Sequence, residues 1–229
     1  MLAYSANPLV VSVSEMRALE AWAVETLGLP SLVLMENAAR NIAQVLMDRA
    51  HTFCAPVVIF AGRGNNGGDG LAIARQLDGA GVPTRTILMG PLERCSPECQ
   101  IQARALLAAG YPLVVSADGF EIGPELASAG SIVDALFGIG LTRPLEAPYS
   151  TIVESINRYG LPVLAVDIPS GLDGDTGMPV GTTAVKATLT ASIGGLKKGL
   201  VLPCAEIWTG EKVTISLGLP KIRQTPVHS

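Results

Sequence analysis

The sequence predicts an α/β protein, a Rossmann-like three-layer αβα sandwich with a mostly parallel central sheet. Short apolar runs alternate with longer stretches of helical spacing, which is the order that β-α-β units produce. The apolar runs are continuous rather than alternating, as strands covered on both faces require. Apolar residues make up 48% of the chain and charged residues 16%, enough for a core on both sides of a sheet.

Two helices are expected at the N-terminal end. The first covers residues 14–27, because Ser14 can cap it and Met16, Leu19, Ala23 and Leu27 repeat at helical spacing. The sequence Gly-Leu-Pro at 28–30 separates it from a second helix over residues 31–49. Both helices carry apolar residues on more than one side, which fits either a core position or a dimer interface.

The remaining elements follow from buried apolar runs separated by turn residues. We expect a helix over 97–109 and strands over 56–61, 84–89, 111–115, 131–134 and 162–167, with shorter strands over 188–193, 205–208 and 213–216. No repeat or linker interrupts the pattern. We therefore expect one domain over residues 1–229, with a frayed polar tail at 221–229.

Charge and cysteine content exclude several function classes. The net charge is −4 without a basic run, which argues against nucleic-acid binding. No apolar stretch approaches the ~18 residues of a membrane span, and the N-terminus lacks the pattern of a signal peptide. Cys54, Cys95, Cys99 and Cys204 accompany only two histidines, so we expect free thiols in the cytoplasm rather than a zinc site.

A glycine-rich segment, GRGNNGGDG at 62–70, joins the first central strand to a helical stretch at 71–77. Glycine and asparagine tolerate positive φ and let a backbone approach a ligand closely. A loop that opens a helix also offers unpaired N–H groups, which favour a phosphate. The segment matches neither the P-loop nor the usual dinucleotide fingerprint. A merely tight turn is the less favoured alternative, because a turn does not require Asn-Asn and Asp.

Two acidic residues, Asp134 and Asp167, each end a predicted strand. Open α/β sheets bind ligands along that edge, although either acid alone could equally well cap a turn. Asp134, Ser170 and Asn66 offer the oxygen atoms that hard cations prefer. The sequence leaves potassium, magnesium or no ion open.

Together these segments resemble the YjeF N-terminal domain family, the NAD(P)H-hydrate epimerases. GRGNNGGDG is followed, in the family's order, by DALFGIG at 134–140, VDIPSGL at 166–172, DTG at 175–177, KKGL at 197–200 and LGLP at 217–220. LMENAA at 34–39 is also family-like, and the family-like core covers residues 12–220. Some members carry a dehydratase domain after this one, and we expect a stand-alone epimerase here.

The resemblance implies a potassium ion held by Asn66, Asp134 and Ser170. It implies substrate contacts at Asn65, Asn66, Gly67, Gly68, Asp69, Gly138, Ile139, Gly140, Leu141, Thr142, Arg143, Pro144 and Asp167. Arg143 could bind a phosphate or be a solvated loop arginine, and the sequence favours neither alternative. Lys197 matches the family lysine, but Leu196 stands where proline is usual, so Lys198 could take its role. We therefore leave lysine out of the catalytic set.

The implied reaction inverts the C6 hydroxyl of hydrated NADH or NADPH between R and S. The ring nitrogen helps to expel the hydroxyl, and water adds to the resulting iminium from the opposite face. We expect Asp167 to be the acid/base, because a carboxylate within hydrogen-bond reach suits that role. A separate NAD(P)H-hydrate dehydratase, which acts on the S form, is the expected functional partner.

Two alternatives stay open. The domain could be a non-catalytic nucleotide-binding or scaffold module, although Asp167 and GRGNNGGDG are intact. It could also be another nucleotide-processing enzyme, because a fold does not fix a function. The preference between NADH hydrate and NADPH hydrate is not visible in the sequence.

Overall fold

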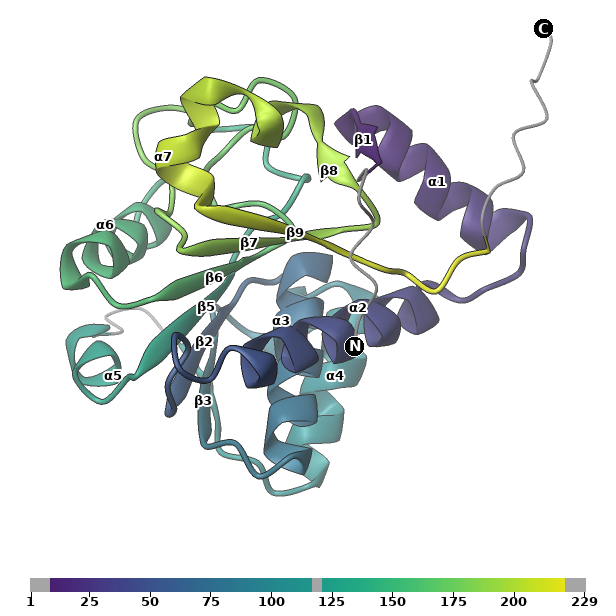
Figure 1. The fold of residues 1–229 in the computed structure, drawn as a ribbon. Coiled ribbons are helices and arrows are strands. Elements are labelled where there is room, and N and C mark those ends of the chain that lie inside the picture. The colour runs from purple at the N-terminus through teal and green to yellow at the C-terminus, as the bar shows by residue number, and fades with distance from the viewer. Residues whose placement is uncertain (1–8, 117–120, 221–229) are drawn as a thin grey trace, which may run out of the picture.

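A seven-stranded sheet forms the centre of the computed structural model, which describes residues 9–116 and 121–220 (Figure 1). The strand order is β4-β3-β2-β5-β6-β7-β9, and every neighbouring pair is parallel. The strands are β2 (Val57–Ala61), β3 (Thr84–Leu88), β4 (Leu113–Val115), β5 (Ser131–Ala135), β6 (Val163–Val166), β7 (Leu189–Ile193) and β9 (Glu211–Ile215). The predicted α/β class with a mostly parallel sheet is confirmed.

Helices cover both faces of this sheet (Figure 1). One face carries α2 (Ser31–Asp48), α3 (Asn65–Gly79) and α4 (Pro97–Ala108), and the other carries α5 (Gly123–Ala127) and α6 (Tyr149–Tyr159). A separate short pair of parallel strands, β1 (Val10–Val11) and β8 (Leu196–Lys197), lies next to α1 (Val13–Glu25). The segment between β8 and β9 forms η2 (Lys198–Val201), η3 (Pro203–Ala205) and α7 (Glu206–Thr209), and η1 (Leu92–Arg94) precedes α4.

The central strand β2 shows why its sequence is continuously apolar. All of its residues are buried. Val57, Ile59 and Ala61 pack into the cluster that includes α2, α3 and α4, whereas Val58 and Phe60 pack into the cluster that includes α6. Successive side chains point to opposite faces of a strand. Both faces are covered, so both sets must be apolar.

The strand order reverses between β2 and β5. From β2 the chain builds outward through β3 and β4, and then returns to place β5 on the other side of β2. The connections after β2 and β5 therefore run to opposite faces of the sheet. In open parallel sheets this separation leaves a crevice outside the carboxyl ends of the strands, and the glycine-rich segment lies at that position.

The first helix begins earlier than the sequence predicts, so Ser14 is the wrong cap. Helix α1 spans Val13–Glu25, and Ser12 caps it. The backbone N–H of Glu15 donates to Ser12 Oγ at 3.1 Å, and the backbone N–H of Ser12 donates to Glu15 Oε2 at 2.7 Å. This reciprocal pair satisfies two N–H groups at once. It favours Ser12 over Ser14.

The predicted strand at 205–208 is also wrong, because these residues belong to η3 and α7. The helix over 149–159 has no counterpart in the sequence prediction, and neither does the β1–β8 pair. The other predicted strands and helices are present with ends within two residues, except that the helical stretch at 71–77 belongs to α3, which begins six residues earlier. The tail at 221–229 lies outside the described residues. Within the described ranges, no helix is long and apolar enough to cross a membrane.

Candidate active site

A cavity of about 1060 Å³ lies at the carboxyl ends of the central strands. Its walls come from α1, the glycine-rich segment after β2, the segment after β5, and Asp167 after β6. Small-molecule sites usually range from about 300 to 1,000 Å³. This cavity is large enough for a dinucleotide.

The glycine-rich segment packs more closely against its neighbours than side chains would allow. A Cβ atom on Gly62 would lie 1.9 Å from the carbonyl oxygen of Leu136, and one on Gly67 would lie 1.8 Å from that of Gly62. A Cβ atom on Gly70 would lie 2.6 Å from the Cβ of Ala135 in β5. The glycines therefore let α3 approach the end of the sheet, which offsets their poor helix propensity.

Helix α3 begins at Asn65, within the segment that the sequence predicts to be a loop up to Gly70. Gly64 is its N-cap, and the first N–H groups of a helix have no acceptor within the helix. Asn65, Asn66 and Asp69 line the cavity. Gly67 and Gly68 do not line it but pack against Gly62 and Met35. The helix terminus thus presents N–H groups and amide side chains suited to an anionic ligand.

Asp167 directly follows β6 in a left-handed backbone conformation, with φ of 70°. Only 8% of the residue is exposed. Its backbone N–H donates to the carbonyl of Ala191 at 2.9 Å, and its Oδ1 accepts from the backbone N–H of Ile193 at 3.2 Å. A non-glycine residue in this conformation is strained, so the neighbouring strand β7 holds it in place. The carboxylate lines the cavity.

Lys197 is the ion-pair partner of Asp167 and is completely buried. Its Nζ donates to Asp167 Oδ1 and, at 2.7 Å, to the carbonyl oxygen of Ile193. Lys198 instead points outward, with 54% of its side chain exposed, and lies 3.2 Å from Glu15 Oε2. The structure therefore places Lys197, and not Lys198, at the candidate site.

Leu196 explains the departure from the family pattern just before this lysine. Its backbone N–H donates to the carbonyl of Leu9 at 2.8 Å. Leu196 also pairs with Val10 in the β1–β8 ladder. A proline has no N–H to donate, so leucine permits a contact that proline would remove. Leucine in place of proline at position 196 therefore does not displace Lys197 from the site.

Two further carboxyl groups, Asp69 and Glu20, line the same cavity. Asp69 is 8% exposed, and burial raises its pKa well above the ordinary value. The charges of Asp167 and Glu20 raise that pKa further, while Lys197 opposes them. Burial also raises the pKa of Glu20, with Asp167 adding to the effect. Asp69, Glu20 and Asp167 thus interact electrostatically in the cavity, with the buried Lys197 beside them.

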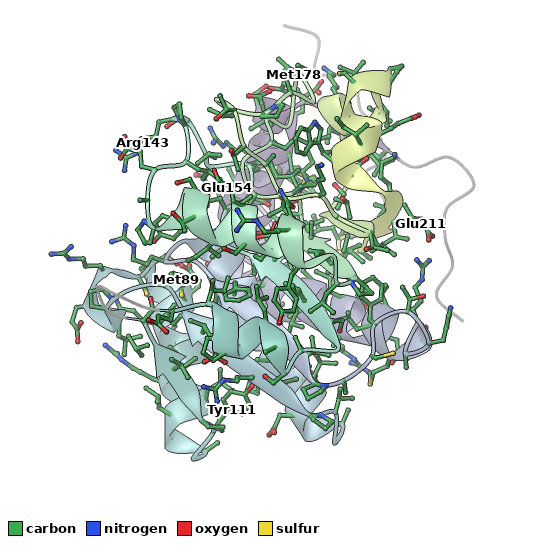
Figure 2. All side chains as sticks on the ribbon, turned by 90° about the vertical axis from the view of Figure 1, so that its left-hand side faces the viewer. Met89, Tyr111, Arg143, Glu154, Met178 and Glu211 are labelled. Atoms are coloured by element: carbon green, nitrogen blue, oxygen red, sulfur yellow. The ribbon has the colours of Figure 1, made fainter. Side chains whose placement is uncertain are left out.

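The segment after β5 reaches the cavity only in its first half. Gly138, Ile139, Gly140 and Leu141 line the cavity, whereas Thr142, Arg143 and Pro144 do not. Arg143 is exposed, and Figure 2 shows it at the periphery, pointing away from the body of the protein. The arginines that do line the cavity are Arg17, Arg63 and Arg94.

Asp134 and Ser170 lie beneath the cavity rather than in its lining. Asp134 is fully buried and accepts from Ser170 Oγ at 2.6 Å and from the Ser170 backbone N–H at 2.8 Å. Burial raises the pKa of Asp134 to about 6, although the bonds from Ser170 oppose the shift. No salt bridge to Asp134 is present among the described residues.

Asn66 completes a set of groups that fits a hard cation. Its Nδ2 is the one buried side-chain polar atom without a hydrogen-bond partner in the described ranges. Rotating the Asn66 side-chain amide by 180° would put its Oδ1 where Nδ2 now lies. This oxygen and the side-chain oxygens of Asp134 and Ser170 are ligands that a hard cation prefers. Within 9–116 and 121–220, no cluster of three or more His, Cys, Asp or Glu side chains could hold a metal ion.

Arg17 and Glu20 are charged cavity residues that the sequence analysis did not identify. Arg17 and Glu20 lie three positions apart on α1, and Arg17 Nη2 donates to the carbonyl of Ile139 at 2.9 Å. Their spacing places both on one side of the helix, next to the buried Met16 and Ala23. A charged face is usually solvated, so only the tertiary structure brings this one to the cavity.

Known proteins are similar to this chain in both sequence and fold. The family model described as YjeF-related protein N-terminus matches residues 31–199. A protein from Limosilactobacillus fermentum named NAD(P)H-hydrate epimerase is 38% identical over 203 residues, covering 89% of this chain and 94% of its own length. One of the same name from Rhodopirellula baltica is 36% identical over 204 residues, covering 89% and 82%.

Two other relatives extend the comparison. A protein from Thermofilum pendens named bifunctional NAD(P)H-hydrate repair enzyme Nnr is 38% identical over 201 residues, covering 86% of this chain and 38% of that protein. The crystal structure of the yeast protein YNL200c superposes with a TM-score of 0.71 at 26% identity, covering 83% of this chain and 82% of the yeast chain.

Proposed function

Because this chain belongs to the family of YjeF-related N-terminal domains, we propose that it is an NAD(P)H-hydrate epimerase. This isomerase repairs hydrated NADH and NADPH by interconverting the R and S configurations at C6 of the nicotinamide ring. The observation that carries the proposal is the Asp167–Lys197 pair at the edge of a dinucleotide-sized cavity. The cofactor is the substrate here, so the nucleotide site needs no second substrate domain.

Asp167 is the proposed acid/base. Inversion requires a group that protonates the departing hydroxyl or takes a proton from the incoming water. The Asp167 carboxylate faces the cavity, and Lys197 supplies a fixed positive charge beside it. The strained backbone and the bond from Ile193 fix the direction of this carboxylate, which is the orientation that a proton-transfer group needs.

We expect the diphosphate of the ligand to lie along the start of α3, away from the nicotinamide ring at Asp167. The N–H groups at Asn65 and Asn66 and the guanidinium groups of Arg63 and Arg94 suit the diphosphate. Arg143 is exposed and lies outside the cavity lining. We therefore favour a solvent-exposed position for it over a contact with a phosphate.

Asn66, Asp134 and Ser170 are the proposed ligands of a potassium ion. When bound, the ion would supply a positive charge next to the buried Asp134 carboxylate and to the start of α3. Asp134 and Ser170 also brace the segment after β5, because the Phe137 N–H donates to Ser170 Oγ at 2.9 Å. These residues therefore shape the cavity wall whether or not they contact the substrate.

The decisive experiment incubates the full chain with the purified R hydrate of NADH and follows the S epimer by chromatography. Reactions with and without potassium, and without protein, run in parallel because the epimers also interconvert spontaneously. We expect inversion well above the spontaneous rate, and a loss of about 100-fold or more in Asp167→Asn. Glu154→Gln on the exposed surface of α6 serves as the control for charge removal.

Two outcomes would contradict this proposal. A folded wild-type protein that binds the hydrate without accelerating inversion would be a non-catalytic nucleotide-binding module. Full turnover in a folded Asp167→Asn protein would remove Asp167 from the mechanism while leaving the epimerase activity intact.

The biological setting is part of the same proposal. We propose that a separate dehydratase consumes the S epimer, that the protein works in the cytoplasm, and that it forms a homodimer. All four cysteines are unpaired, as is usual in a reducing compartment. Light scattering during size-exclusion chromatography measures the oligomeric state directly.

A further inference from the structure

Inversion through an iminium involves two faces of one ring. The hydroxyl leaves from one face with a proton added to its oxygen, and the incoming water loses a proton at the opposite face. A side chain on one side of a planar ring reaches only the oxygen on that side. An epimerase that works this way therefore needs two proton-transfer groups on opposite sides of the bound ring.

We propose that Asp69 is the second proton-transfer group, and that Asp69 and Asp167 serve opposite faces of the nicotinamide ring. The inference rests on the proposed epimerase function. Both carboxyl groups line the same cavity. They come from different walls, because Asp69 is in the first part of α3 and Asp167 follows β6.

The surroundings of Asp69 differ from those of the other buried acids. Asp134 accepts hydrogen bonds from Ser170, and Asp167 is paired with Lys197. Asp69 is 8% exposed, like Asp167, and within the described part of the chain its carboxyl group makes no hydrogen bond. Its oxygen atoms are not among the fully enclosed polar atoms that lack a partner, and the residue lines the cavity. A ligand in the cavity can therefore contact this carboxyl group.

The charges around Asp69 favour its protonated form. Asp167 after β6 and Glu20 on α1 interact with it electrostatically as like charges, while Lys197 on β8 opposes them. Burial and these two acids raise the pKa of Asp69. Asp167 in contrast has a cation in direct contact. Two carboxyl groups in such different surroundings divide into an acid and a base. Glu20 is only half-buried, and it acts here through its charge.

The proton and electron balance closes without a further reactant. Neutral Asp69 gives its proton to the C6 hydroxyl oxygen, the C6–O bond breaks, and the N1 lone pair forms the C6=N1 iminium as water departs. A second water bonds to C6 from the other face while Asp167 takes its proton, and the π electrons return to N1. One water leaves, one is consumed, and solvent returns the proton from Asp167 to Asp69. The reverse reaction exchanges the roles of the two acids.

The test measures inversion and oxygen exchange together in ¹⁸O-labelled water, starting from each epimer of NADH hydrate separately. Wild type should take up ¹⁸O as it inverts. Asp69→Asn should lose inversion by about 100-fold or more, yet still exchange ¹⁸O without inversion in the one epimer whose hydroxyl faces Asp167. Asp167→Asn should exchange only in the other epimer. A group that merely positions the substrate would not separate exchange from inversion in this way.

Matched variants control for structure. Asp78→Asn removes an exposed carboxylate near the end of the same helix and should keep both activities. Asp69→Glu keeps a carboxyl group and should recover part of the inversion. Circular dichroism and thermal unfolding check each fold, and Asp69→Ala replaces Asp69→Asn if the latter does not fold.

Several results would overturn the inference. They are wild-type inversion without ¹⁸O uptake, full inversion in Asp69→Asn, loss of exchange in both epimers in Asp69→Asn, and exchange into the same epimer by both variants. A wild-type protein that does not invert either epimer refutes the epimerase function itself, which separates the two failures.

Discussion

The buried lysine at position 197 is held tightly by its surroundings. Its side chain has no exposed surface, and it donates to Asp167 and to the carbonyl of Ile193. Bringing both charges out of water costs free energy that their attraction offsets only when the geometry is good. The pair is therefore better explained by a task at the cavity than by stability alone.

Removing this lysine should damage both stability and activity. In Lys197→Met, Asp167 would stay buried without its counter-charge, which typically costs about 3–5 kcal/mol in the free energy of unfolding. Urea denaturation measures this cost, and epimer chromatography measures the activity. The exposed Lys198→Met should leave the unfolding midpoint unchanged, because a surface pair contributes little.

A double variant separates the charge effect from lost packing. Asp167→Asn combined with Lys197→Met should recover part of the stability that Lys197→Met alone loses. If the double variant is as unstable as the sum of the single changes, the two residues act independently.

Among the helices, α3 connects the fold to the site most directly. It begins at the proposed anion site, carries Asp69 into the cavity, and packs through its glycines against β5 and the segment before the helix. Helix α1 adds the opposite wall, with Arg17 bonded to Ile139. These two helices lie far apart in sequence from Asp167, and the sheet brings all of them to one edge.

Two glycines of α3 should respond in opposite directions to alanine. In Gly70→Ala the new Cβ would lie 2.6 Å from the Cβ of Ala135, so we expect a loss of about 1–3 kcal/mol from overpacking. Gly79, near the end of the same helix, has open space around it. Gly79→Ala should stabilise the protein by up to about 1 kcal/mol. Thermal unfolding of both variants decides the matter, and equal effects would contradict the packing explanation.

Over the whole molecule, stability and function compete at the cavity. Buried acids with raised pKa values cost the folded state free energy at neutral pH. Asp69 is the clearest case, because nothing in the described ranges pairs with it. Proteins commonly give up stability in this way at sites that act on ligands.

The pH dependence of unfolding should show this cost. Because the pKa of Asp69 is raised in the folded state above the ordinary value of 3.8, the folded protein holds a proton that the unfolded chain releases. The protein therefore loses stability as the pH rises from the pKa of Asp69 in the unfolded chain through its higher pKa in the folded protein. Asp69→Asn should abolish this loss, and the variant should be more stable than the wild type near neutral pH.

Urea denaturation of both proteins between about pH 4 and 8, without ligand, tests the expectation. Asp78→Asn is the control and should follow the wild type, because that carboxylate is exposed. Parallel curves for wild type and Asp69→Asn would show that Asp69 does not hold its proton in the folded state.

The sequence by itself determined the parallel sheet, the position of the glycine-rich segment and the two acids at strand ends. These features depend on local rules. A strand covered on both faces needs a continuous apolar run, such as 57–61. A close approach needs glycine, as at Gly62 and Gly70. The carboxyl end of a parallel strand fixes where nearby residues lie, as for Asp134 near the end of β5 and Asp167 directly after β6.

Tertiary structure alone decided which charges meet and where some elements begin. Lys197 and Lys198 are equivalent in local sequence, and only the β1–β8 pairing turns one inward to Asp167. The start of α3 and the helical state of 205–208 likewise depend on packing that overrides local propensity. Such contacts join residues far apart in the chain, and their free energy is not encoded in any short stretch of it.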